Sequence, residues 1–187
     1  MVTRVVFAFA IFFFFYSAAY PLTIDSQDMQ SLQGGSVVLK PVRQNSVKGT
    51  ETAIIINAPQ EKVWQVLEQK ENLSKFIDQV EEARVLSNNG SDQMVKTSVK
   101  ICKLLPSFDY VICFDHSEKY RRMTFRKTSG CFLELFGCFE FIPYGDSTIL
   151  DCQVYADPGF YIPVFVSSNL KSDVEDIMRS IKREAER

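Results

Sequence analysis

From about residue 83 to residue 156, apolar and polar side chains alternate, and this two-residue period constrains the fold more than any other feature. Turn-forming residues interrupt the alternation, so the pattern predicts strands over residues 109–115, 120–128, 131–142 and 147–156. Short turns between successive strands favour antiparallel pairing with one apolar face and one polar face. The segment is therefore predicted to form an antiparallel meander whose apolar face needs a cover.

A segment after Pro163 can cover this apolar face. After Pro163, apolar residues recur every three or four positions, which predicts one amphipathic helix that ends near Glu186. At a rise of about 1.5 Å per residue, this helix is about 35 Å long and can lie across a whole sheet. Before the meander, the sequence predicts strands over residues 36–42 and 50–56, then two short helices, one after Pro59 and one over residues 72–80.

The first residues have the composition of an export signal. Arg4 precedes an unbroken apolar run of about 12 residues, which is shorter than the roughly 20 that a membrane-spanning helix needs. Ser17 and Ala19 have the spacing of a signal-peptidase site. We therefore expect residues 1–19 to be a signal peptide, with Tyr20 as the first mature residue and export to the periplasm or the cell exterior. An uncleaved segment that anchors the protein in a membrane is the alternative.

The remaining length and composition predict one domain. Residues 20–35 are polar and are predicted to be a flexible lead-in, and residues 36–187 are predicted to form a single domain. The formal net charge of −2 argues against nucleic acid as a partner, because the chain has no overall basic field. We expect a monomer.

Motifs for catalysis are absent from the sequence. It contains no nucleophile elbow, HExxH motif, phosphate-binding loop or dinucleotide fingerprint. The single histidine, His116, falls in a predicted turn over residues 115–118 and is expected to be solvated. We therefore assign no catalytic residue, no cofactor and no metal. The basic stretch of residues 119–127 is expected to be a solvated hairpin end, with transient contact to anionic lipid headgroups as the alternative.

Five cysteines, an odd number, are unusual for an exported chain. A two-residue turn at residues 107–108 sets Cys102 directly opposite Cys113, so a cross-strand disulfide between them is geometrically conceivable. Cys131 and Cys152 are expected to be buried thiols. The mature protein is expected to hold at most one bridge, and no CxxC or Cys/His cluster supports a zinc site.

Three segments in order resemble motifs of the START-like superfamily, which includes the polyketide cyclase/dehydrase and coenzyme Q-binding START-like groups. They are IIINAPQEKVWQVLEQKENLSKFI (54–77), GCFLELFGCFEFIPYGDSTIL (130–150) and ADPGFYIPVFVSSNL (156–170). The resemblance covers roughly residues 37–185, and Phe139 stands where such proteins often have tryptophan. It implies an α+β helix-grip fold, in which a curved antiparallel sheet with two short helices is covered by a long C-terminal helix.

The resemblance also implies a cavity for a hydrophobic ligand between the sheet and that helix. By strand parity, the sheet side chains expected to line it are Tyr110, Ile112, Phe114, Met123, Phe125, Leu133, Leu135, Phe139 and Phe141. The helix residues expected to close it are Phe165, Leu170, Val174 and Ile177.

The expected function is non-catalytic binding or transfer of a hydrophobic small molecule such as a lipid, a quinone or a polyketide-like compound. Two alternatives stay open. The first is a cyclase/dehydrase-type enzyme, which needs a polar pair inside the cavity. The second is a protein-interaction module on the same scaffold, which needs an extended exposed apolar patch.

Overall fold

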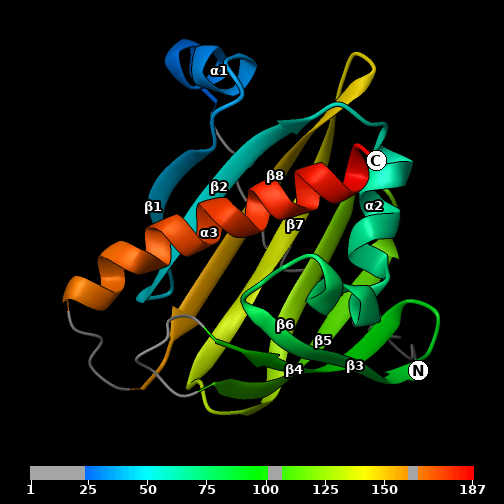
Figure 1. The fold of residues 1–187 in the computed structure, drawn as a ribbon. Coiled ribbons are helices and arrows are strands. Elements are labelled where there is room, and N and C mark those ends of the chain that lie inside the picture. The colour runs from blue at the N-terminus through cyan, green and yellow to red at the C-terminus, as the bar shows by residue number, and fades with distance from the viewer. Residues whose placement is uncertain (1–23, 101–106, 160–163) are drawn as a thin grey trace, which may run out of the picture.

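The computed structural model describes residues 24–100, 107–159 and 164–187. Its centre is one eight-stranded antiparallel sheet with the order β1-β2-β8-β7-β6-β5-β4-β3 (Figure 1). The strands are β1 (Val38–Gln44), β2 (Val47–Ile56), β3 (Val80–Asn88), β4 (Asp92–Val99), β5 (Phe108–Glu118), β6 (Arg122–Gly130), β7 (Glu134–Tyr144) and β8 (Ser147–Asp157). The helices are α1 (Ser26–Gln33), α2 (Gln60–Glu68), the 3-10 helix η1 (Lys70–Lys75) and α3 (Val164–Ala185).

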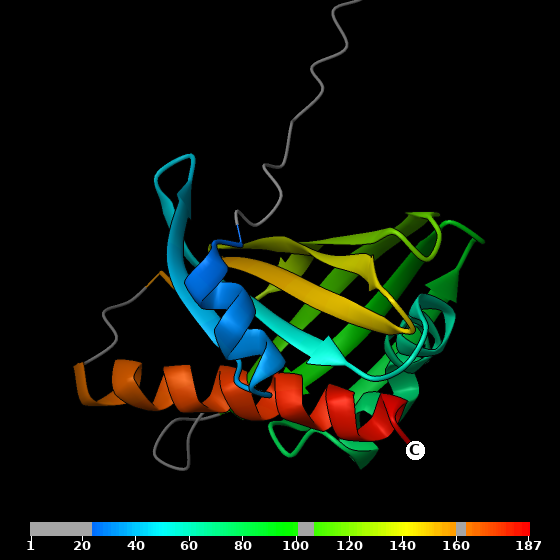
Figure 2. The ribbon, with the colours of Figure 1, turned by 90° about the horizontal axis from the view of Figure 1, so that it is seen from above.

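The 22-residue α3 lies across one face of the curved sheet, and its C-terminal end lies beside α2 (Figures 1 and 2). This face, which we call the concave face, carries the main core. Met178 and Ile181 of α3 are buried there with Ile54 of β2, Trp64 of α2 and Phe141 of β7. The fold is thus the α+β helix-grip fold that the resemblance implies, because the amphipathic helix covers the apolar face of the meander.

Strand β2 is buried on both faces. Ile54 belongs to the main core, whereas Ala53 and Ile55 pack with Ile149 of β8 in a second apolar cluster on the opposite, convex face. Leu32 of α1 completes that second cluster, and Figure 2 shows α1 beside the β1–β2 hairpin. Helix α1 therefore covers part of the face that α3 leaves open.

Helix α1 also corrects the prediction that residues 20–35 form a flexible lead-in. The carboxylate of Asp25 accepts hydrogen bonds from the backbone N–H groups of Gln27 and Asp28, each at 2.8 Å. The carboxylate of Asp28 accepts one from the backbone N–H of Asp25 at 3.1 Å, which completes a capping box. This cap and the buried Leu32 make a helix from a polar segment, of which residues 20–23 lie outside the described part of the chain.

The predicted strands of the meander are present, but the predicted register of its first pair is wrong. Strand β4 ends at Val99, which pairs with Phe108 at the start of β5. The connection between them is longer than a two-residue turn, so Met94 rather than Cys102 lies opposite Cys113. Cys102 itself lies outside the described residues.

The structure also describes the state of four cysteines. Cys113, Cys131, Cys138 and Cys152 are free thiols, so the bridge between Cys102 and Cys113 that the expected register allows is not supported. Cys152 is buried, as predicted. Cys131 is exposed, contrary to prediction, because it follows β6 in a connection and not in a strand.

Candidate functional site

The concave face is an apolar wall made by the inner side chains of β5, β6 and β7. Strand parity places them as the sequence predicts. The buried members of the predicted set are Ile112, Phe114, Met123, Phe125, Leu135 and Phe141. Tyr110, Phe139 and Ile177 are partly buried and pack against them, so part of this apolar wall is accessible.

The remaining members of the predicted set are exposed, half-buried or outside the described part of the structure. Leu133 is 64% exposed, because it precedes β7 and the strand alternation does not apply to it. Its side chain packs against Gly159, where an added Cβ would lie 2.7 Å from Leu133 Cγ. Val174 is half-buried. The side chains of Phe165 and Leu170 lie outside the described part of the structure.

Three phenylalanine rings form a continuous row across the concave face, which we call the phenylalanine row. The ring centroids of Phe114 and Phe125 are 5.8 Å apart, and those of Phe125 and Phe139 are 5.7 Å apart. Gly137 makes room for the middle ring, because an added Cβ would lie 2.6 Å from Phe125 Cζ. The row thus connects buried Phe114 with partly exposed Phe139.

A lysine stands at the buried end of the phenylalanine row. The second predicted short helix forms earlier than expected, as η1, and its first residue, Lys70, is only 1% exposed. The Nζ atom of Lys70 lies 3.9 Å from the ring centroid of Phe114 and 2.9 Å from Met123 Sδ, and it donates a hydrogen bond to the carbonyl of Leu67. Burial lowers the pKa of Lys70 to about 7, because desolvation disfavours the charged amine.

His116 lies against the same group, which corrects the prediction that it is a solvated turn residue. Strand β5 continues to Glu118, and the His116 ring lies 5.6 Å from Trp64 and 6.3 Å from Phe114, centroid to centroid. Desolvation lowers the pKa of His116, and the nearby Lys70 lowers it further. A neutral imidazole is favoured at neutral pH as a result.

Two ring nitrogens in this group lack partners. Among the described residues, neither His116 Nε2 nor Trp64 Nε1 has a hydrogen-bond partner, although both atoms are buried. Buried polar atoms are normally hydrogen-bonded, so unpaired ones mark a place where a ligand can supply the partner. We call Lys70, His116 and Trp64, with Phe114 and Met123, the Lys70 cluster. Sequence analysis missed it because Lys70 stands in a polar stretch and His116 beside two turn-forming residues.

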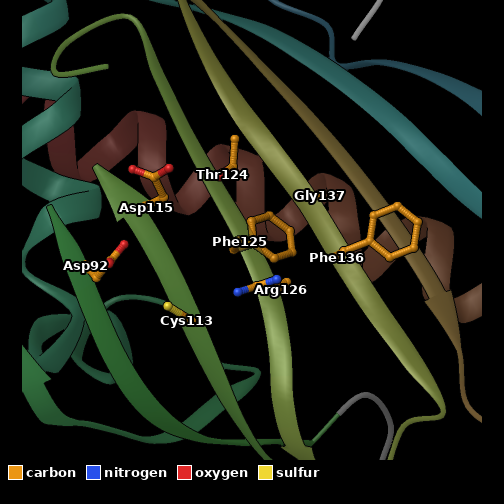
Figure 3. Close-up of a pocket in the computed structure, with 8 residues that line it drawn as sticks. All are labelled: Asp92, Cys113, Asp115, Thr124, Phe125, Arg126, Phe136 and Gly137. Carbon is orange, nitrogen blue, oxygen red and sulfur yellow. The ribbon is translucent and has the colours of Figure 1, made fainter. Parts of the chain in front are cut away.

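The convex face carries a separate hollow of about 410 Å³ over β4 to β7. Figure 3 shows its lining, with α3 behind the sheet; the residues are Asp92, Cys113, Asp115, Thr124, Phe125, Arg126, Phe136 and Gly137. Its aromatic wall is already engaged, because Phe136 stacks on Tyr155 with ring centroids 5.1 Å apart. The open hollow has mixed charge and none of the unpaired ring nitrogens of the Lys70 cluster, so the concave face is the stronger candidate site.

A buried acidic group also lies on the convex face. Asp151 of β8 is 0% exposed, pairs in register with Glu140 of β7 and lies near Glu51 of β2. Burial raises the pKa of Asp151 to about 7, and the two neighbouring carboxylates contribute to this rise. Gln153 Nε2 donates to Glu51 Oε1 at 2.8 Å, whereas no described residue donates to Asp151 Oδ1.

We next consider metal ions, the basic stretch and membrane-spanning helices in the described part of the chain. No set of three His, Cys, Asp or Glu side chains in the described segments could hold a metal ion. In the basic stretch, Arg121 pairs with Glu118 at 3.0 Å and Arg122 lies 3.6 Å from Glu140. No helix of the described chain has both the length and the apolar character that crossing a bilayer requires.

Comparison with known proteins shows a family match for most of the chain. Residues 56–180 match the family model described as polyketide cyclase/dehydrase and lipid transport. No curated protein matches the sequence.

Solved structures share the fold. A STAR-related lipid transfer protein from Xanthomonas axonopodis superposes with a TM-score of 0.66 at 13% identity, over 81% of this chain and 94% of that chain. The protein TTHA0849 from Thermus thermophilus gives 0.64 at 19% identity, over 73% of this chain and 96% of that chain. The Zhui aromatase/cyclase from a Streptomyces species gives 0.62 at 17% identity, over 80% of this chain and 95% of that chain.

Proposed function

The chain belongs to the polyketide cyclase/dehydrase and lipid transport family, and from this premise we propose that it binds or carries a hydrophobic small molecule on the concave face, beneath α3. The observation that carries the proposal is the phenylalanine row, which ends in partly exposed Phe139. Each Å² of apolar surface that a ligand and this wall remove from water contributes about 25 cal/mol. A flat or chain-like apolar molecule fits such a wall of rings and a flexible methionine.

Extraction of the purified protein with organic solvent, followed by mass spectrometry, tests this proposal directly. We expect a co-purified hydrophobic compound, or uptake of quinone, sterol or fatty-acid probes by ligand-free protein. The Phe139→Gln variant should weaken binding of such a probe about tenfold, which corresponds to about 1.4 kcal/mol. Leu86→Gln, at an exposed leucine of β3, is the control and should bind as the unmodified protein does. Failure to recover or take up any of these compounds contradicts the proposal.

A cyclase/dehydrase-type reaction is a second candidate, and the Lys70 cluster favours it. The enzymatic alternative needs a polar pair at the apolar wall, and His116 with Lys70 supplies two titratable groups there. Neutral His116 can accept a proton at Nε2 from an acidic C–H group between two carbonyls. A synthetic linear poly-β-ketone should then cyclise faster with the protein than without it. His116→Ala should remove that acceleration and leave probe binding intact; equal rates with and without protein exclude this candidate.

The interaction-module alternative has less support. The exposed large apolar side chains of the described residues are Leu86, Leu133 and Tyr144, and they stand on different segments of the chain. Scattered single apolar residues are normal on a protein surface and do not make a docking patch.

Export through an N-terminal signal peptide is part of the proposal. Residues 1–19 lie outside the described segments, so the support is the sequence alone. The mass of the mature protein decides it: a chain that starts at Tyr20 supports cleavage, whereas a full-length chain in the membrane fraction supports the anchor alternative.

A further inference from the structure

Lys70 is a buried amine without an acidic partner. No described carboxylate forms an ion pair with it. The groups in contact with its Nζ atom are a carbonyl, a thioether and an aromatic ring, none of which carries a formal negative charge. A buried ammonium is costly unless an anion pairs with it. The buried amine of Lys70 therefore lacks the anionic group that would complete an ion pair with it.

We propose that Lys70 anchors an acidic oxygen, such as a carboxylate, an enolate or a phenolate, carried by the hydrophobic ligand of the concave face. The inference rests on the proposed function and names the ligand class for that same site. A ligand of this class has an apolar body and one anionic oxygen. On binding, the amine holds a proton and forms an ion pair with that oxygen, which removes the cost of the unpaired charge.

The phenylalanine row gives such a ligand a path. It starts at Phe114, whose ring the amine of Lys70 contacts, and it leads through Phe125 to partly exposed Phe139. The apolar body can lie along the row while the oxygen reaches the amine. Met123, whose sulfur lies beside Nζ, is a flexible side chain, and its rotation would open the amine toward this wall.

The same end of the wall offers further hydrogen-bonding groups. Trp64 Nε1 is a donor without a described partner, and His116 Nε2 is also unpaired. Both belong to rings that are in contact with one another, and His116 also contacts the ring of Phe114. A polar group of the ligand can therefore supply the partner that these ring nitrogens lack.

Three acidic groups act on this end through their charge, and none of them forms an ion pair with Lys70 in the described structure. These groups are Glu68 of α2, Asp92 of β4 and Asp115 of β5, and their charges act on Lys70 or on His116. Of these, Glu68 acts on Lys70 through its charge but forms no ion pair with it in the described structure. The positive charge of protonated Lys70 is thus left to a ligand.

The test compares two probes with one apolar body. Dodecanoic acid and methyl dodecanoate displace Nile red, a neutral dye, from the full-length protein at pH 7. We expect the acid to bind at least tenfold more tightly than the ester. Lys70→Met should abolish this preference without weakening the ester, because methionine keeps an apolar chain of similar length. Lys75→Met, at the other end of η1, is the control and should retain the preference.

The pH dependence provides a second readout. Above pH 7 the free amine loses its proton, so binding of the carboxylate must take up one. The affinity for the acid should therefore fall by up to tenfold per pH unit between pH 7 and pH 9, while the affinity for the ester stays level. The Lys70→Met variant should show no such slope.

The outcomes separate the two proposals. If neither probe displaces the dye, both the proposed function and the anchor are overturned. If both probes bind equally, or if Lys70→Met keeps the preference for the acid, the anchor is overturned and hydrophobic binding stands. If Lys70→Met does not fold, the ¹³Cε resonance of Lys70 in the unmodified protein decides. Its pKa should rise by at least one unit with the acid and not with the ester; an unchanged pKa overturns the anchor.

Discussion

At the scale of single residues, the two faces of the sheet hold buried ionisable groups of opposite kinds. Lys70 on the concave face and Asp151 on the convex face both have a pKa of about 7, because burial favours the neutral form of each. Lys70 lies at the buried end of an apolar wall whose other end, at Phe139, is partly exposed, whereas Asp151 is enclosed among other acids and a glutamine. We therefore assign Lys70 to ligand binding and treat Asp151 as a determinant of stability.

Asp151→Asn should raise stability at pH 8. The pKa of Asp151 is about 7 in the fold and near 3.8 in its absence, so the folded state binds more protons between these values. The free energy of unfolding of the unmodified protein should therefore fall as pH rises from about 4 to 7. The variant lacks the charge and should lose this decline, with a gain of about 1–3 kcal/mol at pH 8.

Urea unfolding at pH 5 and pH 8 measures this difference. Asp78→Asn, at an exposed aspartate, is the control and should leave the pH profile as it is. Equal profiles for Asp151→Asn and the unmodified protein would show that Asp151 is ionised in the fold at little cost.

Gly137→Ala should strongly destabilise the protein. An added Cβ would lie 1.9 Å from the backbone oxygen of Gln153 on the neighbouring strand, and it would also press on the ring of Phe125. Such overpacking costs about 1–3 kcal/mol, and more where backbone must move. Thermal unfolding measures the loss. Gly34→Ala, where the nearest atom to the added Cβ is 3.3 Å away, should change stability by less than about 0.5 kcal/mol.

At the scale of elements, periodicity predicted the sheet and its covering helix but not the register at one hairpin. Strands β6, β7 and β8 follow short turns, so alternation and turn residues suffice to place them. The link from β4 to β5 is longer than the predicted turn, and a change in link length shifts every opposite pair. Cys113 therefore faces Met94, a pairing that local pattern alone does not indicate.

The candidate site was predictable only in its apolar part. Phe114, Phe125 and Phe139 follow from strand parity, whereas the Lys70 cluster depends on tertiary contacts between η1, α2 and the end of β5. A lysine in a polar stretch carries no local sign that it will be buried. The same limit applies to α1, whose position depends on a patch that β2 and β8 present together.

Leu32→Ala should release α1 from the convex face. Leu32 is 1% exposed and packs with Ile55 and Ile149, so truncation should cost about 2–5 kcal/mol if α1 is part of the cooperative fold. Amide hydrogen exchange in residues 26–33 should speed up in the variant. Gln30→Ala, at an exposed position on the same helix, is the control. Unchanged exchange in Leu32→Ala would show that α1 is held by other contacts.

At the scale of the whole molecule, the free cysteines can be counted by their reactivity. The four described cysteines are free, and Cys131 is exposed. We expect at least four thiols to react with a chromogenic disulfide reagent in denaturant without reductant. The intact native protein should react more slowly, because Cys138 and Cys152 are buried. Fewer than four thiols in denaturant would contradict the free cysteines.

The strand order has a consequence for association between copies of the protein. Because β1 and β3 end the sheet, each has one side along which no described strand pairs with it. Strand β1 carries Pro41, which lacks an N–H group, and β3 has two irregularities in its pairing with β4, at Val80/Glu82 and at Val85/Ser87. Each edge thus has its own obstacle to the addition of a further strand, so an open sheet of eight strands is protected against edge-to-edge aggregation.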